Sequence, residues 1–405
     1  MERADVIILG GGLVGLTTAL ALDVHGLSSI IVDPAEPASV LAKGFDGRAS
    51  AVASASHAML DAIGVGARLA GQGCAIRTIQ VADGLAPRSL AFEAAPDDAP
   101  LGVMYENRLL RRALHEAAAE AKNVTLIMPA MPAKVERDAT SARVELADGR
   151  AFTAPLLIAA EGRNSPTRKA AGINVAQWRY DHHAIIATLG HEAPHHSIAH
   201  EIFYPSGPFA LLPMTDDADG PRSAVVWTVA AKHGPAMLDL PDRAFLAEAE
   251  KRMGGLLGQL RAASQRSSFP LGFHHSATIT AQRLALVGDA AHGIHPIAGQ
   301  GLNLGFRDVA ALVEVLVEGA RLGLDPGDAQ LLARYEKWRA FDSLSVAFAT
   351  DTLTRLFGLP GKAPRAVRRF GLDMVGRIPP LKRRFMAEAR GETGELPKLL
   401  MGEKV

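Results

Sequence analysis

The chain has 405 residues, of which 48% are hydrophobic, and equal numbers of basic and acidic residues give a formal net charge of zero. This length allows two domains with substantial cores, and the balanced charge gives no case for nucleic-acid binding. The single cysteine, Cys74, excludes an intramolecular disulfide framework and fits a reducing compartment. We expect Cys74 to be a small buried apolar residue.

The first predicted elements are a strand, a glycine-rich turn and a helix. Residues 5–9 form a short apolar run, and Gly10, Gly12 and Gly15 follow it at G-x-G-x-x-G spacing. In this pattern the first glycine permits a tight turn, the second lets a pyrophosphate approach the backbone, and the third lets the helix pack closely on the strand. This spacing after a strand predicts a dinucleotide site.

A second predicted strand, residues 29–32, ends at Asp33, where a carboxylate can bind the hydroxyl pair of a ribose. Strand, turn, helix, strand and acid in this order favour dinucleotide binding over a glycine turn without a ligand. The N-terminal segment, residues 6–22, is apolar enough to resemble a signal peptide. However, Glu2 and Asp5 precede it and three consecutive glycines interrupt it. No other stretch approaches the roughly 20 apolar residues that cross a bilayer. We therefore expect a cytoplasmic protein.

The middle of the chain predicts more of the same domain and then a sheet domain. Residues 108–121 predict a helix, and residues 143–146 and 152–160 predict strands around an Asp148-Gly149 turn. Further on, strands at residues 184–189, 210–213 and 224–230 alternate with turns rich in Pro, Gly and Asp. We predict an α/β fold in which a Rossmann-like cofactor domain is interleaved with a β-sheet substrate domain. The predicted boundaries are residues 1–171 and 284–334 for the cofactor domain, 172–283 for the sheet domain and 335–405 for a C-terminal helical region.

The most informative stretch follows an apolar run that ends at residue 287. Gly288 and Asp289 come first, then Pro296, and then the sequence GQGLNLGFRD at residues 299–308. The pattern predicts a strand end, a rigid turn and a helix start. Its glycines leave backbone N–H groups uncovered at a helix N-terminus, which favours negative charge. Asp289 is placed to accept hydrogen bonds from ligand hydroxyls.

These motifs together resemble the class A FAD-dependent aromatic monooxygenases, and residues 295–308 are similar to the signature of the ubiquinone-biosynthesis hydroxylases. The family usually has Asp in its middle motif where this chain has Glu161, so we expect a longer carboxylate in the same role. The resemblance spans essentially the whole chain and includes residues 45–49, 107–110, 160–168, 335–339, 342 and 350–351.

The resemblance implies noncovalent FAD, NADH or NADPH as cosubstrate, and transfer of one atom of O2 to the aromatic ring of a polyprenylated ubiquinone precursor. It implies a flavin-ring environment made of Pro296, Gly299, Gln300 and Gly301, where a helix N-terminus suits negative charge on the reduced flavin. The implied cofactor-binding residues are Gly10, Gly12, Gly15, Asp33, Arg48, Arg108, Asp289, Gly299, Gly301, Leu302 and Asn303. The sequence identifies no base for a phenolic substrate.

Other functions on this fold stay open. One is a different FAD enzyme, a prenyl reductase or a halogenase, although Trp178, Trp227 and Trp338 are isolated and do not form the Trp-x-Trp element expected of halogenases. The other is a noncatalytic flavoprotein subunit of a ubiquinone-biosynthesis assembly. The sequence also leaves open the ring position that is hydroxylated, the choice between NADH and NADPH, and the oligomeric state.

Two further patterns in the sheet domain have alternative interpretations. Histidines at positions 191, 195, 196 and 200 have a zinc-like spacing, but Pro194 interrupts any shared helix face, so we predict no metal. A group of apolar residues is either a substrate wall or ordinary strand core. Its members are Phe203, Pro208, Phe209, Leu211, Leu212 and Pro213.

The C-terminal region mixes basic and apolar side chains between residues 365 and 385. Such a mixture suits an anionic membrane surface, and it equally suits helices that pack on the cofactor domain with their basic residues in water. The first alternative would place the protein peripherally on the inner membrane, and the resemblance implies contact with other ubiquinone-biosynthesis proteins. The basic residues are Arg365, Arg368, Arg369, Arg377, Lys382, Arg383 and Arg384.

Overall fold

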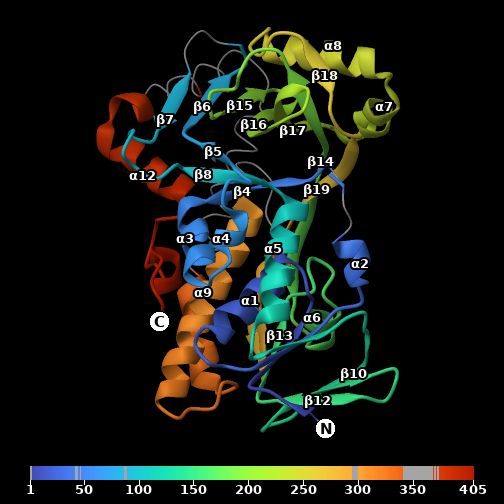
Figure 1. Ribbon diagram of the computed structural model, residues 1–405, viewed down its shortest axis with the longest axis vertical. Helices are drawn as coiled ribbons and strands as arrows, with labels where there is room; N and C mark the ends of the chain where they lie inside the picture. Colours follow the sequence, from blue (N-terminus) through green and yellow to red (C-terminus); the bar gives the residue numbers. More distant parts are fainter. Residues whose placement is uncertain are drawn as a thin grey trace.

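The computed structural model describes residues 2–41, 44–45, 47–85, 89–293, 300–340, 368, 371 and 374–405. Figure 1 shows two halves, one built on a six-stranded sheet with long helices and the other on a nine-stranded sheet. The predicted α/β fold class is confirmed.

The six-stranded sheet has the order β20-β21-β13-β2-β3-β9. All neighbouring pairs are parallel except the edge pair of β20 and β21. Its apolar strands share one core with side chains of three helices, as expected of a parallel sheet that is covered on its faces. The strands are β2 (Val6–Leu9), β3 (Ser29–Val32), β9 (Val124–Ile127), β13 (Leu156–Ala159), β20 (Thr280–Ala281) and β21 (Leu284–Leu286), and the helices are α1 (Leu13–Asp23), α5 (Asn107–Glu120) and α9 (Gln300–Arg321).

Two smaller sheets and several short helices complete this half. A four-stranded sheet contains β1 (Glu2–Arg3), β10 (Pro132–Arg137), β11 (Ala142–Leu146) and β12 (Ala151–Ala154), and a three-stranded sheet contains β4 (Ala49–Ala53), β5 (Cys74–Ile76) and β8 (Gly102–Glu106). The short helices are α2 (Pro37–Val40), α3 (Ser54–Ala62), α4 (Gly66–Leu69), α6 (Pro166–Ala170), η2 (Gly288–Ala290) and η4 (Lys398–Met401).

The nine-stranded sheet forms the other half, with helices on one face. Its core contains Ile185, Phe209 and Leu211 from the strands and Phe245 and Ala249 from α8. The strands are β6 (Thr78–Asp83), β7 (Leu90–Glu93), β14 (Val175–His191), β15 (Ile198–Tyr204), β16 (Gly207–Asp217), β17 (Gly220–Ala230), β18 (Leu260–Ala262), β19 (Ser267–Ser276) and β22 (His292–Gly293). The helices are η1 (Ala231–His233), α7 (Gly234–Asp239) and α8 (Asp242–Met253), and α12 (Pro379–Arg390) lies at the β7 edge in Figure 1.

The predicted strands of the sheet domain lie within β14, β16 and β17, and the Asp148-Gly149 turn joins β11 to β12. The strand predicted over residues 152–160 is instead two strands, β12 and β13, which belong to different sheets. Pro155 lies between them, and a residue without an N–H is a natural break in a ladder. β6 and β7 pair with the nine-stranded sheet although they lie within residues 1–171.

A buried carboxylate ties α9 to the end of β21. Asp308 is fully buried, and it accepts hydrogen bonds from the backbone N–H of Gly288 (2.9 Å) and from Nε of Arg339 (2.7 Å). Nε2 of His292 lies 2.8 Å from Oδ2 of the same carboxylate. Burial disfavours the charged form, but His292 and Arg339 outweigh it and hold the pKa of Asp308 below its usual value. One side chain therefore joins three segments that are distant in sequence.

Replacing Asp308 by Asn should lower the free energy of unfolding by about 3–5 kcal/mol at neutral pH, because the buried Arg339 then lacks its counter-charge. The wild-type protein has a lowered folded pKa at this position, so its contribution is complete above the ordinary carboxyl pKa of about 4 and is lost as pH falls through the folded value. Denaturant unfolding across this pH range measures both effects. Exposed Asp97→Asn is the control, and an Asp308→Asn variant as stable as that control would contradict this role.

Candidate functional site

Four of the predicted site segments meet at one edge of the six-stranded sheet. β2 is followed by Gly10, β3 by Asp33, β13 by residues 160–161 and β21 by residues 287–289. Because these strands are parallel, their carboxyl ends share an edge. Ligands of open α/β sheets bind in the crevice outside such an edge.

The three glycines of the first motif have the three environments that a dinucleotide turn requires. Gly10 has φ of +108°, and a Cβ there would lie 2.4 Å from the carbonyl oxygen of Ala160. A Cβ on Gly15 would lie 1.9 Å from the carbonyl oxygen of Gly10, so α1 can approach the strand end only with glycine at this position. A Cβ on Gly12 would meet nothing within 4 Å. The backbone at Gly12 therefore borders open space, as an approaching phosphate requires.

Asp33 holds the glycine turn in place. Its Oδ2 accepts a hydrogen bond from the backbone N–H of Gly11 (2.6 Å), and its Oδ1 accepts one from that of Ala35 (2.7 Å). A carboxylate has about four lone-pair sites, so these two bonds leave room for ribose hydroxyls. The ribose contact itself stays a prediction.

The middle motif is an internally bonded turn. Glu161 accepts hydrogen bonds from the hydroxyl groups of Ser165 (2.5 Å) and Thr167 (3.1 Å), and Ser165 caps α6. The longer carboxylate thus contacts the turn directly. Buried Arg168 donates to the carbonyl oxygens of Arg163 (2.7 Å) and Ala290 (2.8 Å), which connects this turn to the segment that contains Asp289.

Asp289 follows β21 and is exposed. Its backbone carbonyl lies 2.8 Å from Nε2 of His274, whose pKa is lowered to about 4 by burial, so that ring is neutral at pH 7. Although solvent reaches the residue at the open sheet edge, the protein groups packed around the Asp289 carboxyl desolvate it and raise its pKa above the usual value, and Arg163 and His292 oppose the shift. A carboxylate in such surroundings gains from hydroxyl donors of a ligand.

The start of α9 is fixed to β4. Asn303 accepts a hydrogen bond from the N–H of Ala53 (2.8 Å) and donates to the carbonyl oxygen of Ala51 (2.9 Å). Leu302 packs against the main core, whereas a Cβ on Gly301 would meet nothing within 4 Å. α9 begins at Gln300, and the predicted site residues Pro296 and Gly299 lie outside the described residues.

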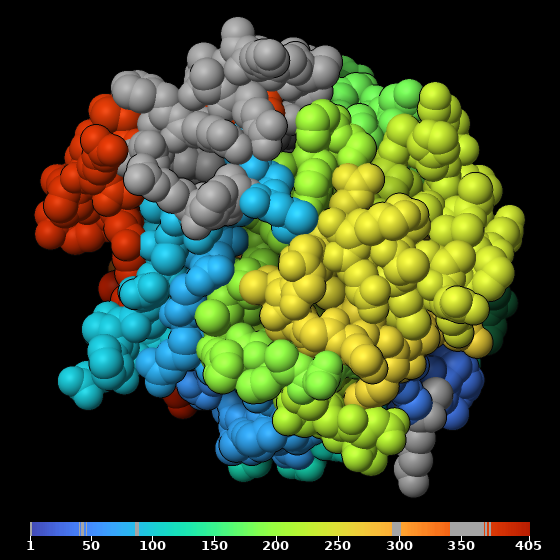
Figure 2. All heavy atoms as spheres, turned by 90° about the horizontal axis from the view of Figure 1, so that it is seen from above, coloured from blue at the N-terminus to red at the C-terminus, as the bar shows by residue number. Residues whose placement is uncertain are grey.

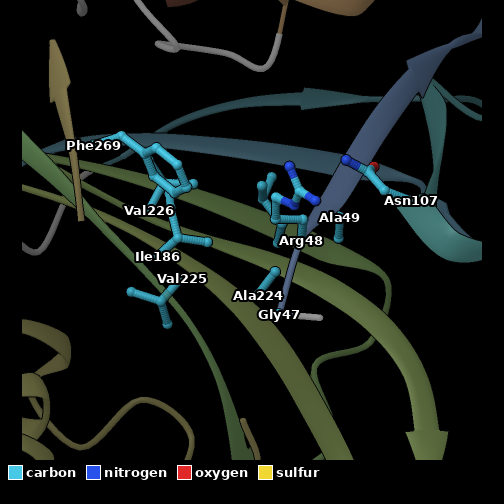
Figure 3. A pocket seen from close by; sticks show the side chains of 10 residues that line it. Gly47, Arg48, Ala49, Asn107, Ile186, Ala224, Val225, Val226 and Phe269 are labelled. Atoms are coloured by element: carbon cyan, nitrogen blue, oxygen red, sulfur yellow. The ribbon is translucent and has the colours of Figure 1, made fainter. Parts of the chain in front are cut away.

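A cavity of about 160 Å³ lies where the nine-stranded sheet faces the cofactor half. Figure 3 shows Arg48 and Asn107 toward one side of it and Ile186, Val226 and Phe269 toward the other. Ile186 and Val226 are register partners on β14 and β17, so they lie on the same face of the sheet. The arrangement gives an apolar wall opposite a guanidinium group.

Arg108, one of the implied cofactor-binding residues, forms an ion pair with Glu106. The buried carboxylate of Glu106 also binds Arg222 at 2.6 Å, and the Arg222 guanidinium lies 5.5 Å from the ring centre of Phe45. Arg108 is therefore anchored at the start of α5, and its contact with FAD stays a prediction.

The apolar group that the sequence left open between a substrate wall and strand core is divided between two faces of the sheet. Leu212 lines the cavity, but Phe209 and Leu211 lie on the opposite face and pack against α8. Side chains alternate between the faces of a strand, so Leu211 and Leu212 point to opposite faces of the sheet. Ile186 and Phe269 were not identified as cavity residues from the sequence. The alternation of side chains along β14 and β19 could have indicated them.

Two of the clustered histidines, His191 and His195, have ordinary protein partners. His191 lies 2.8 Å from the carbonyl oxygen of Ala193 and 3.0 Å from Oγ of Ser223, and His195 lies 2.9 Å from the carbonyl oxygen of Met214. Within the described part of the chain, no three His, Cys, Asp or Glu side chains form a group that could hold a metal. Burial raises the pKa of Cys74 to about 11, which keeps this thiol protonated.

A family model described as an FAD binding domain matches residues 3–343. Ubiquinone hydroxylase UbiL of Rhodospirillum rubrum is 44% identical over 98% of this chain and 93% of its own length. The Escherichia coli 3-demethoxyubiquinol 3-hydroxylase is 33% identical over 96% of this chain and 99% of its own. The human mitochondrial ubiquinone biosynthesis monooxygenase COQ6 is 31% identical over 95% of this chain and 92% of its own.

Solved structures share the fold. The p-nitrophenol 4-monooxygenase PnpA of Pseudomonas putida superimposes with a TM-score of 0.78 at 20% identity, covering 97% of this chain and 100% of its own. The match to the FAD binding domain and the identity to the ubiquinone hydroxylases over nearly the whole chain confirm the resemblance seen in the sequence. The chain belongs to the FAD-binding family, within its ubiquinone-biosynthesis flavin hydroxylases.

Proposed function

We propose that this protein is an FAD-dependent monooxygenase that uses NADH or NADPH and O2 to hydroxylate the aromatic ring of a polyprenylated ubiquinone precursor. The observation that carries the proposal is an open glycine backbone at the carboxyl edge of a parallel sheet, together with an apolar cavity beside Arg48. The family and the activities named for the relatives support the same assignment.

The residues at this edge fit FAD. The open backbone at Gly12 suits a pyrophosphate, Asp33 suits the adenosine ribose and Asp289 suits the ribityl hydroxyls. At the N-terminus of α9, the open backbone at Gly301 favours negative charge near a flavin ring. When bound, FAD supplies the redox chemistry that activates dioxygen.

The cavity residues would position the substrate ring and stabilise negative charge. Ile186, Val226 and Phe269 offer an apolar surface to an aromatic ring and exclude water from it. Arg48 lies across the cavity and offers a positive charge, which stabilises negative charge that develops on a ring oxygen or on the cofactor. Asn303 holds β4, the strand that follows Arg48, against α9.

Asp289→Ala should weaken FAD binding by about 1.5–3 kcal/mol, roughly ten- to a hundredfold, through loss of charge-assisted hydrogen bonds. Gly12→Val should weaken it by placing a side chain in the open space beside the backbone. Fluorescence titration of FAD into apoprotein measures both. Asp97→Ala, an exposed site distant in sequence, is the control, and unchanged affinity in both site variants would refute the cofactor site.

The FAD-loaded protein should convert a short-chain prenylated phenol to its hydroxylated product, with one atom of oxygen taken from labelled dioxygen. Mass spectrometry of the product with ¹⁸O2, and separately with H2¹⁸O, tests this. Labelling from dioxygen supports a monooxygenase. Reduction of the prenyl chain, halogenation in the presence of halide, or no product with any ubiquinone precursor would favour the other functions that the sequence left open.

We also infer that α12 contacts an anionic membrane surface. Figure 2 shows α12 at the rim of the molecule, beside the segment that contains β7. Arg383 and Arg384 are exposed there, and the side chain of Phe385 is 43% exposed although its ring lies 6.2 Å from that of Phe92. Exposed basic and aromatic groups together suit headgroups and the acyl boundary.

The structure narrows the basic set that the sequence suggested. Arg368 is buried and lies 3.4 Å from Asp83, so it is unavailable to a headgroup. Arg365 and Arg369 lie outside the described residues. Among the helices that the structure describes, none has the length and apolarity needed to cross a bilayer.

Replacing Arg383 and Arg384 by Gln should weaken binding to anionic vesicles by about 2 kcal/mol, or roughly thirtyfold, because each basic residue near the surface contributes about 1 kcal/mol. Flotation with phosphatidylserine vesicles at low and high salt measures this. Lys134→Gln with Arg150→Gln, exposed on β10 and next to β12, is the charge-matched control. Equal flotation of the two double variants, or none by the wild-type protein, would leave α12 with a packing role only.

A further inference from the structure

The face of the nine-stranded sheet that forms the cavity wall carries a carboxylate that the proposed function has not used. Glu201 on β15 is the register partner of Ala210 on β16, Ala210 is the partner of Val226 on β17, and Val226 is the partner of Ile186 on β14. Register partners lie on one face of a sheet. Val226 and Ile186 line the cavity, so Glu201 extends the same surface, two strands away from Val226.

The surroundings of Glu201 are apolar. On its own strand it lies between Ala199 and Phe203, each 4% exposed, and its cross-strand neighbours on this face are Ala210 and Val81. Among the residues that the structure describes, no side chain forms a hydrogen bond or ion pair with the carboxylate of Glu201, which is half-buried. Burial raises the pKa of Glu201 to about 7. An apolar wall disfavours a charged carboxylate that has no partner there, and a hydroxyl group of a ligand would supply the missing hydrogen bond.

Other ionisable side chains near this region already have partners. Two carboxylates in particular, Asp83 and Glu106, are neutralised by arginines. Across the cavity, Arg48 also interacts with another group of the protein. The charged and titratable groups that face this part of the sheet from described elements are Asp83 with Arg368, Glu106 with Arg108 and Arg222, Asp216 with His195, Arg48, and the protonated thiol of Cys74.

We propose that Glu201 is the base that takes the proton of the substrate's ring hydroxyl group, an inference that rests on the proposed function. The O–H bond of the hydroxyl breaks, its proton passes to a carboxylate oxygen of Glu201, and the electron pair stays on the ring oxygen. The phenolate raises electron density at the ring carbons ortho and para to that oxygen, which are the carbons that accept electrophilic oxygen. A base whose pKa lies near the working pH is effective in such a transfer.

Turnover of the FAD-loaded full-length enzyme with a short-chain prenylated phenol tests this role. Glu201→Gln should reduce coupled hydroxylation by ~10²–10⁴-fold, the range typical of a lost general base, and FAD affinity should not change. The wild-type rate should rise with pH around 7 because the carboxylate is active when deprotonated, and the Gln variant should lack this rise. A ring-fluorinated phenol, whose hydroxyl is more acidic, should recover part of the loss.

Matched variants separate a catalytic role from a structural one. Glu201→Asp keeps the carboxylate and should retain more activity than Glu201→Gln. Glu250→Gln, on the exposed side of α8, removes a carboxylate from the same half of the molecule and should behave as wild type. Unfolding gives an independent signature. A carboxyl with a raised folded pKa stabilises the fold at low pH, and this contribution is lost as pH rises through about 7. The Gln variant should therefore gain stability relative to wild type above that pH.

Ionisation of the bound phenol provides a test that requires no turnover. Ultraviolet difference spectra of the oxidised wild-type enzyme with the phenol should show phenolate at a pH below the hydroxyl's solution pKa, and Glu201→Gln should abolish this signal. A bound phenol that keeps its solution pKa, or a Gln variant with wild-type hydroxylation and pH profile, would overturn the inference while the proposed function stands. A wild-type enzyme that forms no hydroxylated product from any ubiquinone precursor would instead overturn the proposed function.

Discussion

The buried carboxylate of Asp308 is the interaction on which the site geometry depends. It neutralises Arg339, lies beside His292 and accepts the N–H of Gly288, so α9, the β21 turn and residue 339 share one charged centre. Such a centre is stable only while each partner stays in position, because an isolated buried charge is strongly unfavourable. The positions of the Asp289 segment and of the α9 N-terminus are therefore coupled to each other, although they lie on separate elements.

The two halves contribute different physics to the site. The parallel sheet supplies polar groups at its carboxyl edge, where glycines expose backbone N–H groups and Asp33 and Asp289 supply acceptors. The nine-stranded sheet supplies an apolar wall with few polar groups. A cofactor that carries phosphates and hydroxyls fits the first environment, and a hydrophobic ring fits the second. The cavity lies where the two meet, next to Arg48.

The dinucleotide turn was predictable because its residues obey local rules. The spacing alone assigns a steric requirement to each glycine of the motif, at positions 10, 12 and 15. The environments in the structure match those requirements. The fold class was likewise predictable from the alternation of strands and helices. Asp33 was predicted as a ligand, yet its observed hydrogen bonds to the glycine turn depend on a loop conformation that spacing does not specify.

Other features depend on pairings that a single sequence does not reveal. Alternation along β16 places Phe209 and Leu212 on opposite faces, but the sequence does not show which face packs on α8 and which lines the cavity. The sequence suggested that Arg368 is a surface cation, but it is buried in an ion pair with Asp83, which is distant in the chain. Glu201 could not be identified from the sequence, because its place on the cavity side of the sheet follows from the register of β15 with β16 and of β16 with β17.

The assignment of β6 and β7 to the nine-stranded sheet has a consequence for the order of synthesis. β6 pairs in parallel with β15, and β21 joins the six-stranded sheet only after β14 to β19 of the other sheet have been made. A nascent chain that ends before residue 198 therefore exposes an unpaired strand edge, which is a template for aggregation. Because its sheets depend on contacts between residues far apart in sequence, this protein should fold slowly and only once nearly complete. Each sheet receives strands from both early and late parts of the chain, so neither sheet is complete until β21 or β22 has been made.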